Sequence, residues 1–296
     1  MVKVVVIVVH YGNGVATLYT LNEVDSSITT MTQNKIPVYI VTNSKLSEQI
    51  PVYSNLECIV LNPEKNLGYG GAFNFAYAHI RKERPTIEYF WLLNNDVSQF
   101  SPNIIHSLTE VMHGNPELAA VSPKILKENG KVWFAGARVN IRKGLAVHGM
   151  FNKSGRTPFL TGCALFMSVK ALENVGTFFE QYFLYWEDVD WSLRAIERGF
   201  LLGIVSYTTI THRDHGSSNG STNPYYYLIR NSYIALKRHA PHSSVSLFLV
   251  RRLLRDIRAV VKNPRLLPTI LAANYDGVTL YRKVVALTES KNNDEI

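Results

Sequence analysis

Short apolar runs alternate with longer amphipathic stretches through the first half of the chain. The runs are rich in β-branched and aromatic residues and end at turn residues, which is the pattern of buried β-strands; they are 2–9, 38–41, 58–61, 89–93 and 119–121. Between them, residues 15–33, 71–84 and 103–113 have helical spacing, and Ser101 with Pro102 predicts where the last helix begins. This alternation predicts an α/β fold with a mostly parallel sheet covered by helices on both faces.

The second half of the chain has a looser pattern. Residues 124–160 carry five glycines among polar positions and predict loops with short antiparallel strands. A strand is predicted over 161–168 and a helix over 188–198, and from residue 224 onwards the chain reads as largely helical. We therefore expect two domains, an α/β domain over 1–223 and a helical region over 224–296.

Composition narrows the class of protein. With 296 residues, of which 46% are hydrophobic and 11% aromatic, the chain can bury a full core. Its two cysteines, Cys58 and Cys163, exclude a disulfide scaffold and a multi-cysteine zinc site. The early apolar run from Val4 to Val9 is far shorter than the roughly 20 residues that span a bilayer, and no signal-peptide layout accompanies it. We expect a cytoplasmic protein.

The excess positive charge is confined to one segment. The formal charge is +8, and residues 230–283 hold eleven Lys or Arg against two acidic residues. On 245–262, apolar side chains fall on one helical face and basic side chains on the other. This pattern fits a core-packed helix with a solvated basic face, or a helix lying on an anionic membrane surface. Nucleic acid is not an expected partner, because no nucleic-acid-binding motif is present.

Four short motifs could carry chemistry, and each has a plainer interpretation. Asp96 follows a predicted strand, so its carboxylate could hold a hard cation at the strand's carboxyl end, although Asn-Asn-Asp is also ordinary turn sequence. The glycines of 66–74 precede a predicted helix and would allow close approach to a ligand, or simply form a tight loop. The spacing of 66–74 fits neither a Walker loop nor a dinucleotide fingerprint.

The other two motifs lie later in the chain. Glu187, Asp188 and Asp190 form an acidic cluster among aromatic residues, where desolvation would raise the proton affinity of a carboxylate and suit it to act as a general base. Asp190 is four residues before Arg194 and is expected to pair with it. His212 follows an apolar run that could deliver it to the same crevice, where it could complete a metal site with an aspartate.

Taken in order, these motifs resemble those of family 2 glycosyltransferases, inverting enzymes of the GT-A fold, and in particular their rhamnosyltransferase-like and galactofuranosyltransferase-like branch. The resemblance covers roughly residues 3–231. It is carried by His10-Tyr11-Gly12, the Asn66–Asn74 loop, Leu93-Asn94-Asn95-Asp96, Thr161-Gly162, the 183–190 segment, His212, Tyr226 and Arg230-Asn231.

The resemblance implies a role for each matched residue. Asp96 and His212 are the expected ligands of Mn²⁺ or Mg²⁺, Asp188 is the expected catalytic base, and Glu187 is expected beside it. The implied donor-binding residues are His10, Tyr11, Thr42, Asn66, Gly68, Gly71, Asn74 and Asn95, and the implied acceptor-binding residues are Trp186, Thr161 and Gly162. The family often has an aspartate near Thr42-Asn43-Ser44 to contact the nucleotide base, so both uridine and deoxythymidine donors stay open.

The resemblance implies an inverting glycosyltransferase of surface polysaccharide or cell-wall synthesis. Its donor would be dTDP-rhamnose or a UDP-sugar, and its acceptor a hydroxyl on a glycan or a polyprenyl-linked sugar. Such an acceptor would suit attachment of 245–262 to the inner face of the cell membrane. Two alternatives are a sugar-phosphate nucleotidyltransferase, whose Arg/Lys activation loop is not found near the first strand, and a catalytically inactive GT-A scaffold at the membrane.

Overall fold

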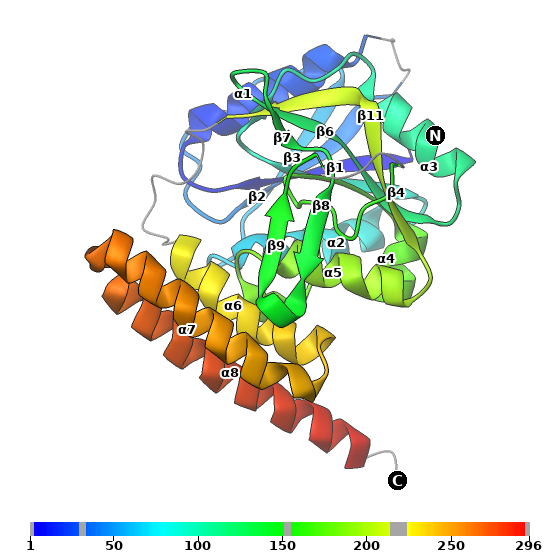
Figure 1. Cartoon of the computed structure of the whole chain (residues 1–296). Helices are drawn as coiled ribbons and strands as arrows, with labels where there is room; N and C mark the ends of the chain where they lie inside the picture. Colours follow the sequence, from blue (N-terminus) through cyan, green and yellow to red (C-terminus); the bar gives the residue numbers. More distant parts are fainter. Residues whose placement is uncertain (1–2, 30–33, 151–154, 214–223, 294–296) are drawn as a thin grey trace. The chain divides into compact units, whose positions relative to one another are not determined.

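The computed structural model describes residues 3–29, 34–150, 155–213 and 224–293, with side chains up to residue 283. The chain forms two compact units, which Figure 1 shows and which are described separately below. The α/β unit consists of Met1–Arg138, His148–Phe183 and Glu187–Ser221, and the helical unit of Val139–Val147, Leu184–Trp186 and Thr222–Ile296. The helical unit thus includes two short segments that the sequence analysis placed in the first domain.

Nine strands form the sheet of the α/β unit. They are β1 (Val4–His10), β2 (Ile36–Thr42), β3 (Leu56–Leu61), β4 (Tyr89–Asn94), β5 (Val97–Ser98), β6 (Leu118–Lys127), β7 (Val132–Phe134), β10 (Ala164–Ser168) and β11 (Leu201–His212). Their order is β3-β2-β1-β4-β10-β6-β11-β5, with β7 paired to β6. Every residue of β1 and β2 is buried, as expected for strands that are covered on both faces.

The sheet confirms the α/β prediction and shows where parallel pairing stops. Strands β3, β2, β1 and β4 are parallel, and β6 is parallel to β11. Strand β10 runs antiparallel between β4 and β6, so the sheet is mixed at that point. The flanking helices are α1 (Gly14–Ser27), α2 (Gly68–Glu83), α3 (Ile104–Gly114), α4 (Val169–Val175) and α5 (Glu187–Glu197).

Two predicted boundaries were wrong because strand pairing overrides local sequence. Ser101 does not cap α3: its N–H donates to the Thr209 carbonyl at 2.9 Å and its Oγ accepts from the Thr209 N–H at 2.8 Å, so the N-cap is Asn103 in the left-handed region. Strand β6 continues to Lys127, inside the stretch predicted as loops, because β11 pairs with it over that length. Apart from these two, helix α1 ends at Ser27. Residues 30–33 of its predicted range, 15–33, lie outside the described residues.

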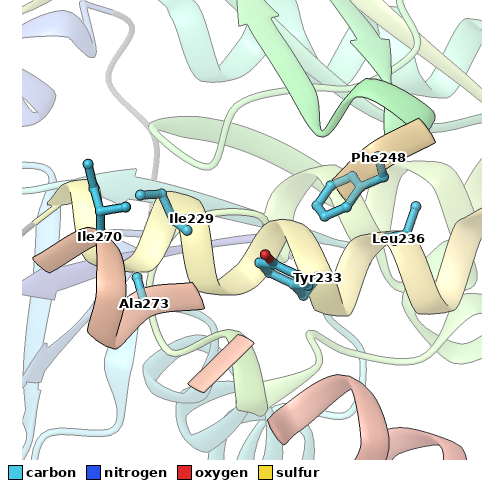
Figure 2. Packing of buried hydrophobic residues seen from close by; sticks show 6 residues of the cluster. All are labelled: Ile229, Tyr233, Leu236, Phe248, Ile270 and Ala273. Atoms are coloured by element: carbon cyan, nitrogen blue, oxygen red, sulfur yellow. The ribbon is translucent and has the colours of Figure 1, made fainter. Parts of the chain in front are cut away.

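The helical unit is built on α6 (Pro224–His239), α7 (Val245–Lys262) and α8 (Leu267–Asn293). Strands β8 (Ala137–Asn140) and β9 (Leu145–His148) form a separate two-stranded sheet, of which Val139–Val147 belongs to the helical unit. The buried cluster of the three helices, drawn in Figure 2, consists of Ile229, Tyr233, Leu236, Phe248, Ile270 and Ala273. Of these six, Phe248 comes from α7, and the partly buried Val245, Ala259 and Val260 of α7 pack against the cluster. No helix in the described residues is long and apolar enough to cross a membrane.

The orientation of α7 differs in part from one of the two sequence interpretations. A core-packed helix would bury its apolar face and expose its basic face. Instead Arg252 is buried on α7 in an ion pair with buried Asp256, and Asn274 donates to Asp256 at 2.9 Å. The apolar side chains of α7, Leu253 and Ile257 among them, are exposed. Helix α7 is therefore packed on the core, but through a face other than the predicted apolar one.

A strained segment of the helical unit is held by one amide. Tyr185 and Trp186 both have positive φ, at 63° and 75°, a conformation that costs roughly 1–3 kcal/mol for a residue other than glycine. The fully buried Asn231 side chain on α6 donates to the Leu184 and Tyr185 carbonyls at 2.7 and 2.8 Å. The Trp186 indole is buried and donates to the Leu228 carbonyl at 3.1 Å. These bonds offset the strain.

Candidate active site

Strand ends bring Asp96 and His212 together. Asp96 follows β4, and the next two residues form β5, which pairs with β11 so that Val97 lies opposite His212. This register sets the Asp96 Oδ1 and the His212 Nε2 3.5 Å apart. The Asp96 carbonyl also accepts from the Arg213 N–H at 2.9 Å, which ties the two chain segments together beside the side chains.

Aromatic residues fix the imidazole of His212. The ring of Trp133 on β7 stacks on it, with ring centroids 4.6 Å apart and planes inclined by 1°. The His148 ring meets Trp133 edge-on at 4.7 Å. Burial and, to a smaller extent, the neighbouring His212 together lower the pKa of His148 to about 4, so His148 is neutral at pH 7. The sequence analysis missed Trp133 and His148, which lie on short strands within the stretch predicted as loops with short antiparallel strands.

The Asp96–His212 pair fits a cation held by two protein ligands. Two donor atoms on one Mn²⁺ or Mg²⁺, each about 2.1 Å from it, lie roughly 3 Å apart when they are adjacent in an octahedron. The observed 3.5 Å needs little adjustment to reach that spacing. In the described part of the chain no group of three or more His, Cys, Asp or Glu side chains could hold a metal.

Asp188 is anchored to the strand beside Asp96. It lies in the first turn of α5, where its Oδ2 accepts from the Gly162 N–H at 2.9 Å and its Oδ1 from the Val189 N–H at 2.7 Å. Residues 162 and 163 lead into β10, and the Asn94 N–H donates to the Cys163 carbonyl at 3.0 Å. The Asp188 carboxylate is thereby attached to the segment that lies next to the end of β4.

Cys163 and Tyr69 lie between the two aspartates. Burial raises the pKa of the buried Cys163 thiol well above its usual value, and the charges of Asp96 and Asp188 raise it further. Burial also raises the pKa of the half-buried Tyr69, and smaller contributions come from Cys163, Glu187, Asp96 and Asp188. The Tyr69 hydroxyl donates to the Gly162 carbonyl at 2.7 Å. Because Asp188 bonds to Gly162 and Asn94 bonds to Cys163, Asp96 and Asp188 both lie beside the segment that joins β10 to the end of β4.

Glu187 is a buried carboxyl next to Asp188. Its Oε2 has no hydrogen-bond partner in the described part of the chain. Burial raises its pKa well above the ordinary value of 4.5, and the adjacent Asp188 adds to the shift. Burial also raises the pKa of Asp188, while the backbone N–H groups of Gly162 and Val189 act against that rise. Both carboxyls hold a proton more readily than exposed acids do, and this property suits proton transfer near neutral pH.

We expect Glu187→Gln to stabilise the fold at high pH. At pH 8, folding must either bury the Glu187 charge or take up a proton, and glutamine does neither. The variant should gain on the order of 1–3 kcal/mol at pH 8, and the gain should disappear only well below the ordinary pKa of 4.5, where glutamate is protonated in both states. Thermal unfolding measured from pH 8 down to about one and a half pH units below that pKa tests this, with exposed Glu64→Gln as the matched control. An equally stable or weaker Glu187→Gln variant at pH 8 contradicts the assignment.

The glycine-rich segment packs against the protein's own acidic motif. Gly68 has φ +73°, and a Cβ there would lie 2.2 Å from the Phe183 carbonyl oxygen. A Cβ on Gly70 would lie 2.9 Å from the Phe178 Cβ. The Tyr69 N–H at the start of α2 donates to the Phe183 carbonyl at 2.7 Å, and the Gly68 N–H donates to Asn66 Oδ1 at 2.8 Å. At these two glycines the backbone lies against the segment that leads into the acidic motif, and the donor-binding role of Gly68 stays a prediction.

Gly71, Asn74 and Thr161 complete this arrangement. A Cβ on Gly71 would lie 3.2 Å from the Leu67 Cβ. The Asn74 amide bonds with the backbone of Phe178 in both directions, at 2.8 and 3.0 Å, and so holds the segment that precedes the acidic motif. Thr161 is buried and accepts from the Cys163 N–H at 3.4 Å. Each of these residues positions the backbone next to Asp188.

The remaining predicted donor residues form a network at the ends of β1, β2 and β4. His10 Nδ1 lies 2.7 Å from Thr17 Oγ1, and burial lowers the pKa of His10. Asn95 Nδ2 donates to Thr17 Oγ1 at 3.0 Å and to the Tyr11 carbonyl at 3.2 Å. Thr42 Oγ1 donates to Asn62 Oδ1 at 2.7 Å. These contacts tie together the strand ends that border the site.

Asn43 supports the site although the sequence analysis gave it no role. Its side chain donates to the Gly68 carbonyl at 2.9 Å and accepts from the Leu67 N–H at 3.0 Å, which fixes the loop entering α2. Its position directly after β2 could have signalled this role. Asp190 has the structural role expected of it, because it is fully buried and pairs with Arg194 at 2.9 Å.

Known proteins give an independent comparison. One relative, described as an N-acetylglucosaminyl-diphospho-decaprenol L-rhamnosyltransferase from Mycobacterium tuberculosis, is 26% identical over 254 residues, covering 77% of this chain and 78% of the relative. Among solved structures, S. aureus TarS 1-349 matches with a TM-score of 0.58 and 14% identity, covering 94% of this chain and 80% of that one.

A second solved structure shows the same fold. The mannosyltransferase PcManGT from Pyrobaculum calidifontis, in complex with GDP-Man and Mn²⁺, matches with a TM-score of 0.54 and 16% identity, covering 97% of this chain and 79% of that one. The fold is thus the GT-A fold that the motifs implied. Residues 6–176 match the family model described as Glycosyl transferase family 2. The chain belongs to glycosyl transferase family 2.

Proposed function

We propose that the chain is a metal-dependent, inverting glycosyltransferase that transfers a sugar from a nucleoside diphosphate donor to a hydroxyl of a polyprenyl-linked acceptor. The observation that carries this proposal is the placement of a half-buried carboxylate, Asp188, on the segment that bonds to the end of β4, near the Asp96–His212 pair. One group can accept a proton there while two others can hold a cation. The lipid-linked acceptor is suggested by the name of the mycobacterial relative.

Asp96 and His212 would hold the cation, through one carboxylate oxygen and one imidazole nitrogen. A divalent ion bound there neutralises charge on the leaving diphosphate. The mixed oxygen and nitrogen donor set suits Mn²⁺ better than Mg²⁺, which prefers oxygen ligands. Trp133 would keep the His212 ring in the orientation that the structure shows.

Asp188 would act as the base in a single displacement. Its carboxylate accepts the proton of the acceptor hydroxyl while that oxygen attacks the anomeric carbon of the donor. A glycosidic bond forms, the bond from the anomeric carbon to the diphosphate oxygen breaks, and the diphosphate leaves with its electron pair. Attack from the side opposite the leaving group inverts the anomeric configuration, through a transition state with oxocarbenium character.

The donor is proposed to be dTDP-rhamnose or a UDP-sugar, bound near His10, Tyr11 and Thr42. The rhamnosyltransferase relative favours rhamnose, and the hydroxyl at Thr42 is compatible with either base. Trp186, Thr161 and Gly162 are retained as proposed acceptor residues. The product would be a lipid-linked glycan of the cell surface.

A thermal-shift screen tests the proposal directly. UDP, dTDP and GDP are each added with Mn²⁺, with Mg²⁺ or with EDTA. At about 100 times its Kd, a ligand adds roughly 2.7 kcal/mol of stability, which raises Tm by several degrees for a chain of this size. We expect a shift for UDP or dTDP that requires the divalent ion, and none for the matching nucleosides. The absence of a metal-dependent shift with all three would favour the inactive scaffold. The nucleotide that binds then selects the donors for a transfer assay.

A further inference from the structure

Helix α7 carries its apolar side chains on the outside of the helical unit. Seven of them are between 43% and 77% exposed: Leu247, Leu249, Val250, Leu253, Leu254, Ile257 and Val261. Five recur at helical spacing along one face, and we call Val250, Leu253, Leu254, Ile257 and Val261 the α7 strip. A run of exposed aliphatic residues of this length is typical of a surface that binds another protein or a membrane.

The opposite face of α7 fixes this orientation. Phe248 enters the core cluster and lies against Gly144, where a Cβ would come within 2.6 Å of its ring. Arg252 pairs with the buried Asp256, and Arg255 donates to the Gly144 carbonyl at 3.0 Å. Turning α7 to bury the strip would withdraw Phe248 from the core cluster and break the contacts of Asp256 with Asn274 and of Arg255 with the Gly144 carbonyl. The strip is therefore held outward by polar contacts.

The charge around the strip is positive. Arg251, Arg258 and Lys262 follow one edge of the α7 strip, and the last two are exposed. Among the described side chains of the helical unit, the carboxylates are Asp256, which pairs with Arg252, and Asp276, which accepts from the Tyr226 hydroxyl. Neither lies on the strip. An anionic surface approaching α7 would meet cations on the edge of the strip.

We propose that the α7 strip docks the chain on an anionic lipid bilayer. The aliphatic side chains enter the boundary between headgroups and acyl chains, and Arg251, Arg258 and Lys262 meet lipid phosphates. A second copy of this chain is a poorer partner, because two strips packed face to face would bring two basic edges together. This inference deepens the proposed function, since a polyprenyl-linked acceptor resides in a bilayer, but its test needs neither donor nor acceptor.

Vesicle co-sedimentation of the full chain tests the docking. The probes are vesicles of phosphatidylcholine alone and vesicles in which about a third of the lipid is phosphatidylglycerol. We expect the chain to sediment with the anionic vesicles at least ~10-fold more than with the neutral ones. Raising the salt from 0.1 to 1 M shortens the Debye length from about 10 to about 3 Å and should lower the bound fraction. Equal binding to both vesicle types, or no binding to either, overturns the proposal.

Paired variants assign the binding to the strip. Leu253→Glu/Ile257→Glu should lower vesicle binding by ~10-fold or more, since it places two carboxylates in the apolar surface. The matched control is Val52→Glu/Tyr207→Glu, which makes the same change in charge at two exposed apolar side chains of the α/β unit. The control should bind as the unmodified chain does. Circular dichroism and thermal unfolding must show that both double variants are folded. If the α7 variant fails to fold, Arg258→Gln/Lys262→Gln replaces it. This variant should also bind less to the anionic vesicles.

Two further measurements separate this inference from its alternatives. Sedimentation equilibrium without lipid should find the chain and the α7 double variant in the same state of assembly. A dimer that the α7 variant dissociates, together with the absence of vesicle binding, would identify the strip as a self-association face instead. Transfer to a water-soluble acceptor analogue should be equal in the α7 variant and the unmodified chain. If both proteins lack transfer activity and only the α7 variant loses vesicle binding, the proposed function is contradicted and the proposed membrane docking is supported.

Discussion

Asp188→Asn should lower the rate of sugar transfer by about 10² to 10⁴-fold, the usual contribution of a general base. The carboxamide keeps the size of the side chain and cannot accept the proton of the acceptor hydroxyl. Donor affinity should change little, because the residues proposed to hold the donor and the cation are other ones. Transfer at saturating donor measures the loss, and titration with the nucleoside diphosphate measures the binding. Retention of near-normal turnover would remove Asp188 from the role of base.

The substitution also has a structural cost that needs its own control. Both Asp188 oxygens accept backbone N–H bonds, from Gly162 and Val189, and an amide nitrogen would face one of these donors. The matched control is Asp190→Asn, which disturbs a fully buried carboxylate that accepts from Arg194 Nε at 2.9 Å and from the Tyr182 hydroxyl at 3.2 Å. Asp190→Asn should lower Tm at least as much as Asp188→Asn does. At a temperature where both are folded, it should retain most of the transfer rate.

The acid limb of the pH profile adds a further signature of Asp188. Burial raises the pKa of this carboxyl above 3.8, so the charged base is lost on acidification earlier than an exposed aspartate would be. Transfer should fall with decreasing pH through that raised pKa. In Asp188→Asn the residual transfer rate should no longer fall through that pH range. In Asp190→Asn the transfer rate should still fall there.

The strands and the metal pair could be predicted from sequence because their signals are local. Uninterrupted β-branched runs identify buried strands, and Asp96 and His212 are each found at the end of one. Trp133 and His148 could not be predicted in the same way. Each comes from a short antiparallel strand in a glycine-rich stretch, and their place beside His212 depends on the pairing of β7 with β6 and of β6 with β11.

Two features could not be predicted in full from the sequence, and for the same reason. Glycine indicates that something approaches the backbone closely, but not what approaches; at Gly68 it is the Phe183 carbonyl. Likewise, amphipathic spacing on 245–262 shows that the helix has two faces, but not which one meets the core. Asp256, the acid four residues after Arg252 on the basic face, is the local sign that part of this face is buried. In both cases the missing information is the identity of the tertiary neighbour.

Asp96→Asn should abolish most metal-dependent activity, with a loss of transfer above about 10²-fold at a fixed low concentration of Mn²⁺. Removing a partner of a ligand typically costs 10 to 100-fold in metal affinity, and removing the charged ligand itself should cost more. Asparagine keeps the shape of the side chain, so the contact of the Asp96 carbonyl with the Arg213 N–H is retained. Isothermal titration with Mn²⁺ and UDP or dTDP measures the affinity without depending on turnover.

The test becomes sharper when the second ligand and its aromatic neighbour are varied as well. His212→Ala should weaken Mn²⁺ binding, and combining it with Asp96→Asn should add little further loss, because both residues serve one site. Trp133→Phe removes the indole that stacks at 4.6 Å on His212 but leaves both ligands, so it should lower the Mn²⁺ affinity less than either ligand variant. His106→Ala, at an exposed histidine of α3, is the control and should leave the affinity unchanged. Independent, additive losses from Asp96→Asn and His212→Ala would mean that the two side chains do not share a cation, and the assignment of the pair as a metal site would then fail.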